Sequence, residues 1–523
     1  MKTKITNQLL SVATALALLL TMTGLAVTAS AAEYDTANAT SFVFSDGGIA
    51  VTEGAYSGYK VKNTSLTINA AGTYVVSGSC ANGTIVVKKN VTGVTLVLDS
   101  LTLSASATAP ITCNKGSGVT IVAKAGSVND LSDDRYNNDD VYSDETTYPD
   151  IENAVVKCKD GSNVTLSGTG TINVNAYGKN GVKGGADLYE EDENGNATTT
   201  LLSTASLTIE DVTLNVIIRH SYKDPEDASS YDGDAIKSEK ELNILSGNIT
   251  VSANDDGIKS DYVLNIGAEG TDGPTINVTK ATEGMEGATV NVYSGSVYVN
   301  ATDDGINAAN GDIADRSADF AYNQYGGYVY INVTNGDGID SNGSATLSGG
   351  KLEVYAPSQG DGDPIDTEYG CAFSGATVLA VGHAMMPQSY SGVYVAFGGS
   401  GGRPGFGGMG GNTGGNIVTA GNTVTITDAS GNTLYTAQSQ SPRNASYVVF
   451  ASPSVASGTG YTLNGSATAT ATTATGGNMG PGGQGGFPGQ GGEGISAGFG
   501  NILIWLRDLI SRIVSFFQSF IQK

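Results

Sequence analysis

Apolar and polar residues alternate with a period of two in short runs along most of the chain. In Val297–Val299 and Val329–Val333, for example, β-branched residues alternate with Tyr or Asn. This alternation predicts β-strands with one buried face. Gly, Asn and Asp separate the runs, and no helical period stands between them. We therefore predict an all-β fold.

An acidic turn repeats through the middle of the chain. An acidic residue stands two positions before an apolar residue at Ile236, Ile258, Met285, Ile306, Ile339 and Ile365, with successive spacings of 22, 27, 21, 33 and 26 positions. Two or three short strands per interval are typical of one coil of a parallel β-helix. The general preference for right-handed crossovers favours the right-handed form.

The strand patterns divide the chain into successive parts. An open coil exposes unpaired backbone groups, so a solenoid needs caps at its ends. We predict a signal peptide at 1–31, an N-terminal β cap at 32–93, a parallel β-helix at 94–385, a C-terminal β module at 386–465 with a Gly-rich loop at 398–415, a Thr/Ala and then Gly-rich linker at 466–500, and an amphipathic helix at 501–523.

Both ends of the chain carry targeting signals. Lys2 and Lys4 precede an apolar run, and Ala29–Ala31 offers the small residues that a signal peptidase requires. We therefore expect a secreted protein that is extracellular or associated with the cell surface. Residues 501–523 place apolar side chains on one helical stripe and polar ones opposite, which suits contact with a membrane surface. A helix that packs on its own protein or self-associates is the alternative.

Charge and cysteine content narrow the partners. The chain has 51 Asp and Glu residues against 26 Lys and Arg residues, a net charge of −25, which argues against nucleic acid and favours cations or neutral polymers. Cys113 and Cys158 stand at the same offset before a Val-Thr strand, so we expect them on neighbouring coils, either as a disulfide or as free thiols. Cys80 and Cys371 have no evident mate.

The repeated acidic turns predict calcium sites. Strands on successive coils lie about 4.8 Å apart, so carboxylates at one turn position stack and repel unless a cation lies between them. Calcium takes oxygen ligands at about 2.3–2.6 Å, which suits carboxylates on two coils. The predicted ligands are Asp255, Asp256, Glu283, Asp303, Asp304, Asp337 and Asp340, with a further cluster of Asp361, Asp363 and Asp366. The alternative is that these side chains hydrogen-bond their own turns.

An insertion rich in Tyr and Asp interrupts the coils between Asn129 and Glu152. We predict that Tyr136, Tyr142 and Tyr148 lie against sugar rings, and that Asp139 and Asp140 bind sugar hydroxyl groups. A solvated insertion without a ligand is the alternative.

Several of these segments, taken in order, resemble a known family. They are Asn129-Asp130-Leu131-Ser132-Asp133 with Tyr136, Glu152-Asn153-Ala154-Val155, Val164–Gly170, Asp256-Gly257-Ile258-Lys259-Ser260 and Gly336–Gly343. Over roughly residues 40 to 465, the chain resembles secreted bacterial carbohydrate-binding β-helix proteins. The resemblance implies a right-handed, pectate-lyase-like β-helix that binds calcium and plant cell-wall polysaccharide, cellulose or polygalacturonate, without established catalysis. Met285 and Pro364 depart from the family's turn pattern.

Two catalytic functions remain as alternatives to binding. A calcium-dependent pectate lyase would use Lys237 or Lys259 as the base, but neighbouring carboxylates hold a lysine proton more tightly. A polygalacturonase would need a Gly-His-Gly turn and an Arg-Ile-Lys strand, and the sequence has neither. A structural cell-surface protein is a further alternative. We predict a calcium-bound protein that binds plant polysaccharide without catalysis.

Overall fold

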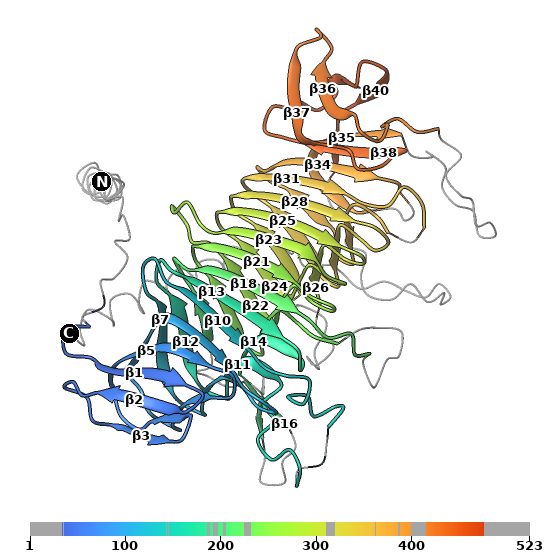
Figure 1. Ribbon diagram of the computed structural model, residues 1–523. Coiled ribbons are helices and arrows are strands. Elements are labelled where there is room, and N and C mark those ends of the chain that lie inside the picture. The colour runs from blue at the N-terminus through green and yellow to red at the C-terminus, as the bar shows by residue number, and fades with distance from the viewer. Residues whose placement is uncertain are drawn as a thin grey trace, which may run out of the picture. The chain divides into compact units, whose positions relative to one another are not determined.

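This computed structural model describes residues 34–474 apart from residues 35, 143, 145, 186–188, 192–196, 202–205, 224–231, 310–319, 361, 385–387 and 399–414. The regular secondary structure of these described residues consists of β-strands, and most of the strands belong to one 35-stranded sheet (Figure 1). The prediction of an all-β fold is confirmed for these residues. Among them, no helix has the length and apolar character needed to cross a membrane.

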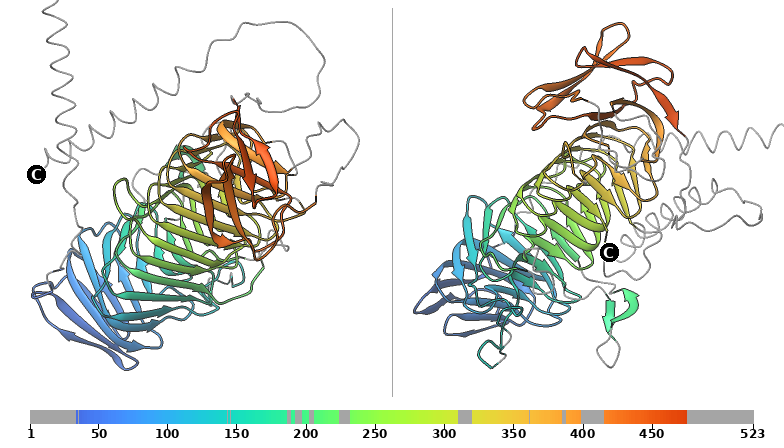
Figure 2. Two further views of the ribbon diagram at one scale, coloured as in Figure 1. Left: turned by 90° about the horizontal axis from the view of Figure 1, so that it is seen from above. Right: turned by 90° about the vertical axis from the view of Figure 1, so that its right-hand side faces the viewer.

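Most strands stack in three parallel ladders, and the chain visits the ladders in turn as it winds (Figures 1 and 2). The first ladder runs through β1 (Thr40–Ser45), β5 (Gly72–Cys80), β7 (Val94–Ser104), β10 (Val128–Ser132), β13 (Thr171–Ala176), β18 (Thr213–Ile218), β21 (Asn248–Ser252), β23 (Thr275–Lys280), β25 (Ser296–Ala301), β28 (Tyr328–Val333), β31 (Lys351–Tyr355) and β34 (Thr377–Gly382).

The second ladder carries the acidic turns. It runs through β4 (Ser65–Ile68), β6 (Thr84–Val87), β8 (Ile111–Cys113), β11 (Ala154–Cys158), β14 (Asn180–Gly184), β19 (Ile236–Ser238), β22 (Ile258–Ile266), β24 (Met285–Val292), β26 (Ile306–Ala308), β29 (Ile339–Ser341) and β32 (Asp366–Thr367).

The third ladder closes each coil. It runs through the first parts of β5 and β7 and then through β9 (Gly118–Ala123), β12 (Asn163–Ser167), β17 (Ser206–Ile209), β20 (Glu241–Ile244), the later parts of β22 and β24, β27 (Ala321–Gln324), β30 (Ser344–Leu347), β33 (Cys371–Phe373) and β35 (Tyr390–Gly398).

The interior follows from the period of two, because alternate side chains of every coil point inward. Ile258, Met285, Ile306 and Ile339 occupy one register position on successive coils and are fully buried. Met285 thus replaces an isoleucine in the stack without breaking it, because the flexible thioether fills the same space. Cys113 and Cys158 are register neighbours, as predicted, and both are buried free thiols.

Amide side chains form a hydrogen-bonded row on the third ladder. Asn265 donates to Oδ1 of Asn243 at 2.9 Å, Asn291 to Asn265 at 3.0 Å, and Asn323 to Asn291 at 3.1 Å. Each side chain sits at the same register position one coil further along. The row therefore satisfies polar groups that the stacking would otherwise leave without partners.

Replacing Asn291 with Ala should lower the free energy of unfolding by about 1–3 kcal/mol, because it leaves the Asn265 acceptor and the Asn323 donor unpaired at a position that is 8% exposed. Urea unfolding monitored by circular dichroism measures this loss. Asn300→Ala is the matched control, because Asn300 also accepts from the next coil but is exposed to water. Equal losses in the two variants would contradict the argument.

Antiparallel pairing appears at both ends of the ladders. β2 (Gly48–Thr52) pairs with β1, and β3 (Tyr59–Lys62) pairs with β4. The parallel ladders begin earlier than the predicted boundary at residue 94, because β5 and β6, assigned to the cap from sequence, already pair in parallel with β7 and β8. Their alternating pattern continues that of the coils. A separate hairpin joins β15 (Tyr189–Glu191) to β16 (Ala197–Leu201).

The C-terminal module is a four-stranded antiparallel sheet of β36 (Thr423–Asp428), β37 (Thr433–Gln440), β39 (Gly460–Leu463) and β40 (Ala467–Thr470). Two further strands, β38 (Tyr447–Ala451) and β41 (Thr472–Ala474), pair with β35. The prediction that the linker begins at residue 466 is therefore wrong, since the Ala/Thr alternation of 467–474 forms strands. Buried Glu353 of β31 fastens the module by accepting from the Tyr435 hydroxyl at 2.5 Å and the Gln438 amide at 2.8 Å.

The predicted signal peptide at 1–31, the Gly-rich part of the linker and the helix at 501–523 lie outside the described residues, as does most of the Gly-rich loop 398–415.

Candidate functional site

The outward side of the second ladder carries one charged or amide side chain per coil. We call this row the charged column. The members of the column are basic up to Lys259, and from Glu286 onward they are acidic or amide side chains. It consists of Lys157, Lys183, Lys237, Lys259, Glu286, Asn307, Asp340 and Asp366.

The turns that enter these strands bring carboxylates together where the column changes sign. Asp234, Asp255 and Asp256 each offer an oxygen, and these oxygens lie within 4.8 Å of one another. Asp256, Glu283 and Glu286 form a second such group. We call them the first and second carboxylate groups. They share Asp256, which is 2% exposed.

Burial and mutual repulsion disfavour the charged form of carboxylates in both groups. Burial, and then the charges of Asp256 and Asp234, raise the pKa of Asp255 to about 9. Burial and the charge of Asp256 likewise raise the pKa of Glu283 to about 8. Oδ1 of Asp256 is buried and has no hydrogen-bond partner. An orphaned, buried carboxylate oxygen among other carboxylates fits a hard oxygen-seeking ion such as calcium.

Three of the predicted ligands, Asp255, Asp256 and Glu283, are therefore brought together by the structure. Asp234 and Glu286 also belong to these groups and were not among the predicted ligands. Their signals were in the sequence, because Asp234 starts the first of the six acidic turns and Glu286 directly follows Met285 in the third.

The remaining predicted ligands are used differently along the next coils. Oδ1 of Asp304 accepts from the Asp337 amide at 2.6 Å, and Oδ1 of Asp337 accepts from the Asp363 amide at 2.5 Å. Each carboxylate thus caps the backbone of the next turn, a variant of the alternative in which Asp binds its own turn. Burial still raises the pKa of Asp304 to about 7 and that of Asp337 to about 8.

The other members of the predicted ligand set do not join the two carboxylate groups. Burial and the charge of Asp366 raise the pKa of Asp340 to about 6. Asp366 accepts a hydrogen bond from Gln388 at 2.9 Å. Asp303 lies beside Asp304 in its turn, and Asp361 lies outside the described residues.

The two lysines considered as lyase bases are held in their charged form. Lys259 lies 2.9 Å from Asp256 and 2.6 Å from Glu286, and Lys237 lies 3.6 Å from Asp261. Burial alone would lower their pKa values, but the surrounding carboxylates outweigh burial and raise the pKa of both. An ammonium group that keeps its proton cannot abstract one from a sugar. Lys157 differs, because burial and the charge of Lys183 lower its pKa to about 8.

The tyrosines of the insertion pack against one another. The rings of Tyr136 and Tyr148 stack at 5.3 Å, and Tyr142 meets them edge-on at 4.9 and 5.5 Å. Asp140 forms an ion pair with Lys179, while the amide of Asp139 donates to Asn153. These predicted sugar-binding residues thus form a compact cluster in which the rings cover one another.

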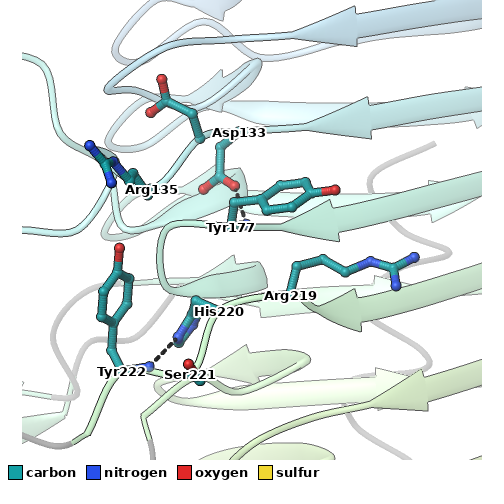
Figure 3. Close-up of a pocket in the computed structure, with 8 residues that line it drawn as sticks. Asp133, Arg135, Tyr177, Arg219, His220, Ser221 and Tyr222 are labelled. Atoms are coloured by element: carbon teal, nitrogen blue, oxygen red, sulfur yellow. Dashed lines mark hydrogen bonds between the residues drawn. The ribbon is translucent and has the colours of Figure 1, made fainter.

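A pocket of about 520 Å³ opens beside this cluster (Figure 3). It is built where three successive strands of the first ladder end, because Asp133–Arg135 follow β10, Tyr177 follows β13, and Arg219–Tyr222 follow β18. Figure 3 shows the Tyr177 and Arg219 side chains extending in the same direction, while Tyr222 points toward Arg135. Tyr177 is 45% exposed.

Hydrogen bonds fix the floor of the pocket. Buried Asp133 accepts from the amides of Tyr177 and Gly178 at 2.6 and 3.2 Å, and burial raises its pKa to about 7. Nδ1 of His220 accepts from the Tyr222 amide at 3.3 Å, so its Nε2 donates to the Lys179 carbonyl at 2.8 Å. His220 therefore positions the backbone and stacks on Tyr222, at 5.1 Å between ring centroids.

Sequence reasoning missed Tyr177, Arg219 and Tyr222. Tyr177 directly follows Ala176, and Arg219 directly follows Ile218, the register partner of Ala176 on the next coil. The available signal was this shared offset after the alternating runs Thr171–Ala176 and Thr213–Ile218, which becomes visible once the register is known.

A comparison with family models matches the segment that contains the pocket. Residues 62–271 match the family model of carbohydrate-binding domain-containing proteins. No curated protein matches the chain. Among solved structures, the chain is similar to a polysaccharide lyase-like protein from C. thermocellum, solved as a gadolinium derivative, at 20% identity and a TM-score of 0.34, over 65% of this chain and 96% of that one. That likeness is too remote to assign a property. Residues 62–271, which include every residue lining the pocket, are therefore similar to carbohydrate-binding domains.

Proposed function

We propose that the protein binds a plant cell-wall polysaccharide outside the cell, with calcium as its structural ion and without catalysis. The observation that carries the proposal is the pocket of Tyr177, Arg219 and Tyr222 within the segment that matches carbohydrate-binding domains. Aromatic rings offer apolar faces to sugar rings, and a few polar groups around them fix orientation.

Two arginines of the pocket suit an acidic glycan. Arg135 and Arg219 lie on different sides of the pocket in Figure 3. Asp134 and Asp133 line it with them, and burial raises the pKa of Asp133 to about 7. A guanidinium group presents paired donors that match a carboxylate. A uronate-containing polymer such as polygalacturonate can use both the rings and the arginines, whereas cellulose uses the rings alone. We therefore favour polygalacturonate.

Calcium and export complete the proposal. The first carboxylate group supplies oxygen ligands, and the orphaned Asp256 oxygen supports a cation beside it. The signal-peptide pattern at 1–31 supports secretion, and the amphipathic pattern at 501–523 supports contact with a membrane surface. The three parallel ladders support a right-handed parallel β-helix, the form that parallel crossovers favour.

A pull-down of the full-length protein with insoluble polygalacturonate and with cellulose tests this function. We expect retention on polygalacturonate in calcium and loss of retention after chelation, with weaker retention on cellulose. Failure to bind either polymer in calcium would favour a structural surface protein. Release of unsaturated uronides or new reducing ends during the incubation would instead show a lyase or a hydrolase.

A further inference from the structure

We propose that the ammonium group of Lys259 is a built-in cation that fills the second carboxylate group and limits calcium to the first. The proposal rests on the part of the proposed function in which the protein binds calcium. It adds how many ions bind and which residue sets that number. It concerns two overlapping cation positions that share Asp256.

Distances identify Lys259 as the occupant of the second group. Its Nζ lies 2.9 Å from Oδ2 of Asp256 and 2.6 Å from Oε2 of Glu286, one carboxylate on its own coil and one on the next. Calcium would bind such oxygens at about 2.3–2.6 Å. The ammonium nitrogen therefore stands close to where a metal ion would bridge the two coils.

The first group has no such occupant. Lys259 engages Oδ2 of Asp256 and leaves Oδ1 buried without a partner. None of the ion pairs of the described residues joins a lysine or arginine to Asp234 or Asp255. Asp234 and Asp255 thus lie beside the unused buried oxygen of Asp256 without an ion pair of their own among the described residues. This side of Asp256 is where the ion binds.

A neighbouring amide shows what the second group would offer if Lys259 were absent. Asn307, the register neighbour of Glu286, donates through Nδ2 to Oε2 of Glu283 at 2.8 Å. Its Oδ1 is buried without a hydrogen-bond partner. Removal of the Lys259 ammonium would leave the carboxylates of Asp256 and Glu286 without a counter-charge beside the unused Oδ1 of Asn307. Calcium prefers such a set of oxygen ligands. Charge balance also favours an added divalent ion there, because each buried carboxylate would otherwise remain unpaired.

Lys259→Met tests the proposal, because it keeps the length of the aliphatic stem and removes the charge. We expect this variant of the full-length protein to bind one more calcium ion per chain than the wild type, by calcium content after gel filtration and by isothermal titration calorimetry. Lys237→Met is the matched control, since Lys237 occupies the same column position one coil earlier and pairs with Asp261. We expect it to leave the number of ions unchanged. A folded Lys259→Met protein with the wild-type number would overturn the proposal.

Glu286→Gln provides a test that does not depend on removing the lysine. Glu286 binds Lys259 rather than the ion in the wild type, so this variant should keep the wild-type number of ions, whereas Asp255→Asn should lose one. Loss of an ion in Glu286→Gln would overturn the proposal. A wild-type protein that binds no calcium would instead refute the calcium clause of the proposed function. In that case, an ion gained by Lys259→Met would still support the role of Lys259.

Discussion

The calcium-free protein is expected to lose thermal stability as the pH rises from 5 to 8, and added calcium should remove most of that loss. Asp255 and Glu283 have folded-state pKa values of about 9 and about 8, well above those of exposed carboxyl groups. Between pH 5 and pH 8, the folded chain therefore holds protons that the unfolded chain has released, so its free energy of unfolding falls as the pH rises. Bound calcium replaces those protons and stabilises the charged carboxylates.

The expected difference is large because several carboxylates contribute at once. One pKa unit corresponds to about 1.4 kcal/mol, so melting temperatures at pH 8 with and without calcium should differ by at least about 5 °C. Differential scanning fluorimetry at pH 5, 6, 7 and 8, in chelator or in calcium, measures the effect. Asp255→Asn should flatten the pH dependence in chelator. Identical melting temperatures with and without calcium at pH 8 would refute a structural calcium ion.

Substitutions in the pocket should weaken polysaccharide binding. Tyr177→Ala removes an exposed ring, and Arg219→Ala removes a guanidinium group that extends beside it. Loss of about 1.4 kcal/mol corresponds to a tenfold weaker affinity. We expect about a tenfold loss for polygalacturonate in each single variant and on the order of 100-fold in the double variant, if the two contacts are independent. Affinity electrophoresis in gels containing the polymer measures the change.

Two comparisons make this prediction specific. Arg219→Ala should affect polygalacturonate more than cellulose, because cellulose has no carboxylate for the guanidinium group to bind. Tyr325→Ala is the matched control, since Tyr325 is also an exposed tyrosine, 48% accessible, but follows β27 on a distant coil. If Tyr325→Ala weakened binding as much as Tyr177→Ala, the glycan would bind somewhere other than the pocket.

The fold was predictable to the extent that it depends on local pattern. Alternation of apolar and polar residues determines which side chains face the interior, and the recurring turns before Ile236 and Ile258 place these residues on neighbouring coils. The common offset of Cys113 and Cys158 identified a register pair for the same reason. The predicted domain limits were less accurate. The Thr/Ala sequence of β40 and β41 is typical of a linker, and these strands are stabilised by pairing with β39 and β35.

The candidate site was predictable only in part. The repeated acidic turn made Asp255, Asp256 and Glu283 predictable as members of the site. The role of Glu286 was not predictable, because it depends on a hydrogen bond from Lys259 of the preceding coil. The tyrosines of the insertion were conspicuous in the sequence, yet Tyr136 and Tyr148 cover one another, because stacked rings remove apolar area from water. The pocket itself required the register, since Tyr177 and Arg219 become neighbours through the pairing of β13 with β18.

The charged column has a consequence for engineering. Each coil supplies a single rung to it, and its neighbours above and below are fixed by the register between Lys157 and Asp366. Replacing one residue of the column changes the electrostatic potential at the coil that carries it, while the side chains that face the interior keep their packing. Because Lys259 forms ion pairs with Asp256 and with Glu286 on the next rung, neighbouring rungs have to be exchanged together. A column redesigned in this way would present chosen charges about 4.8 Å apart, for instance to template an inorganic lattice of matching spacing.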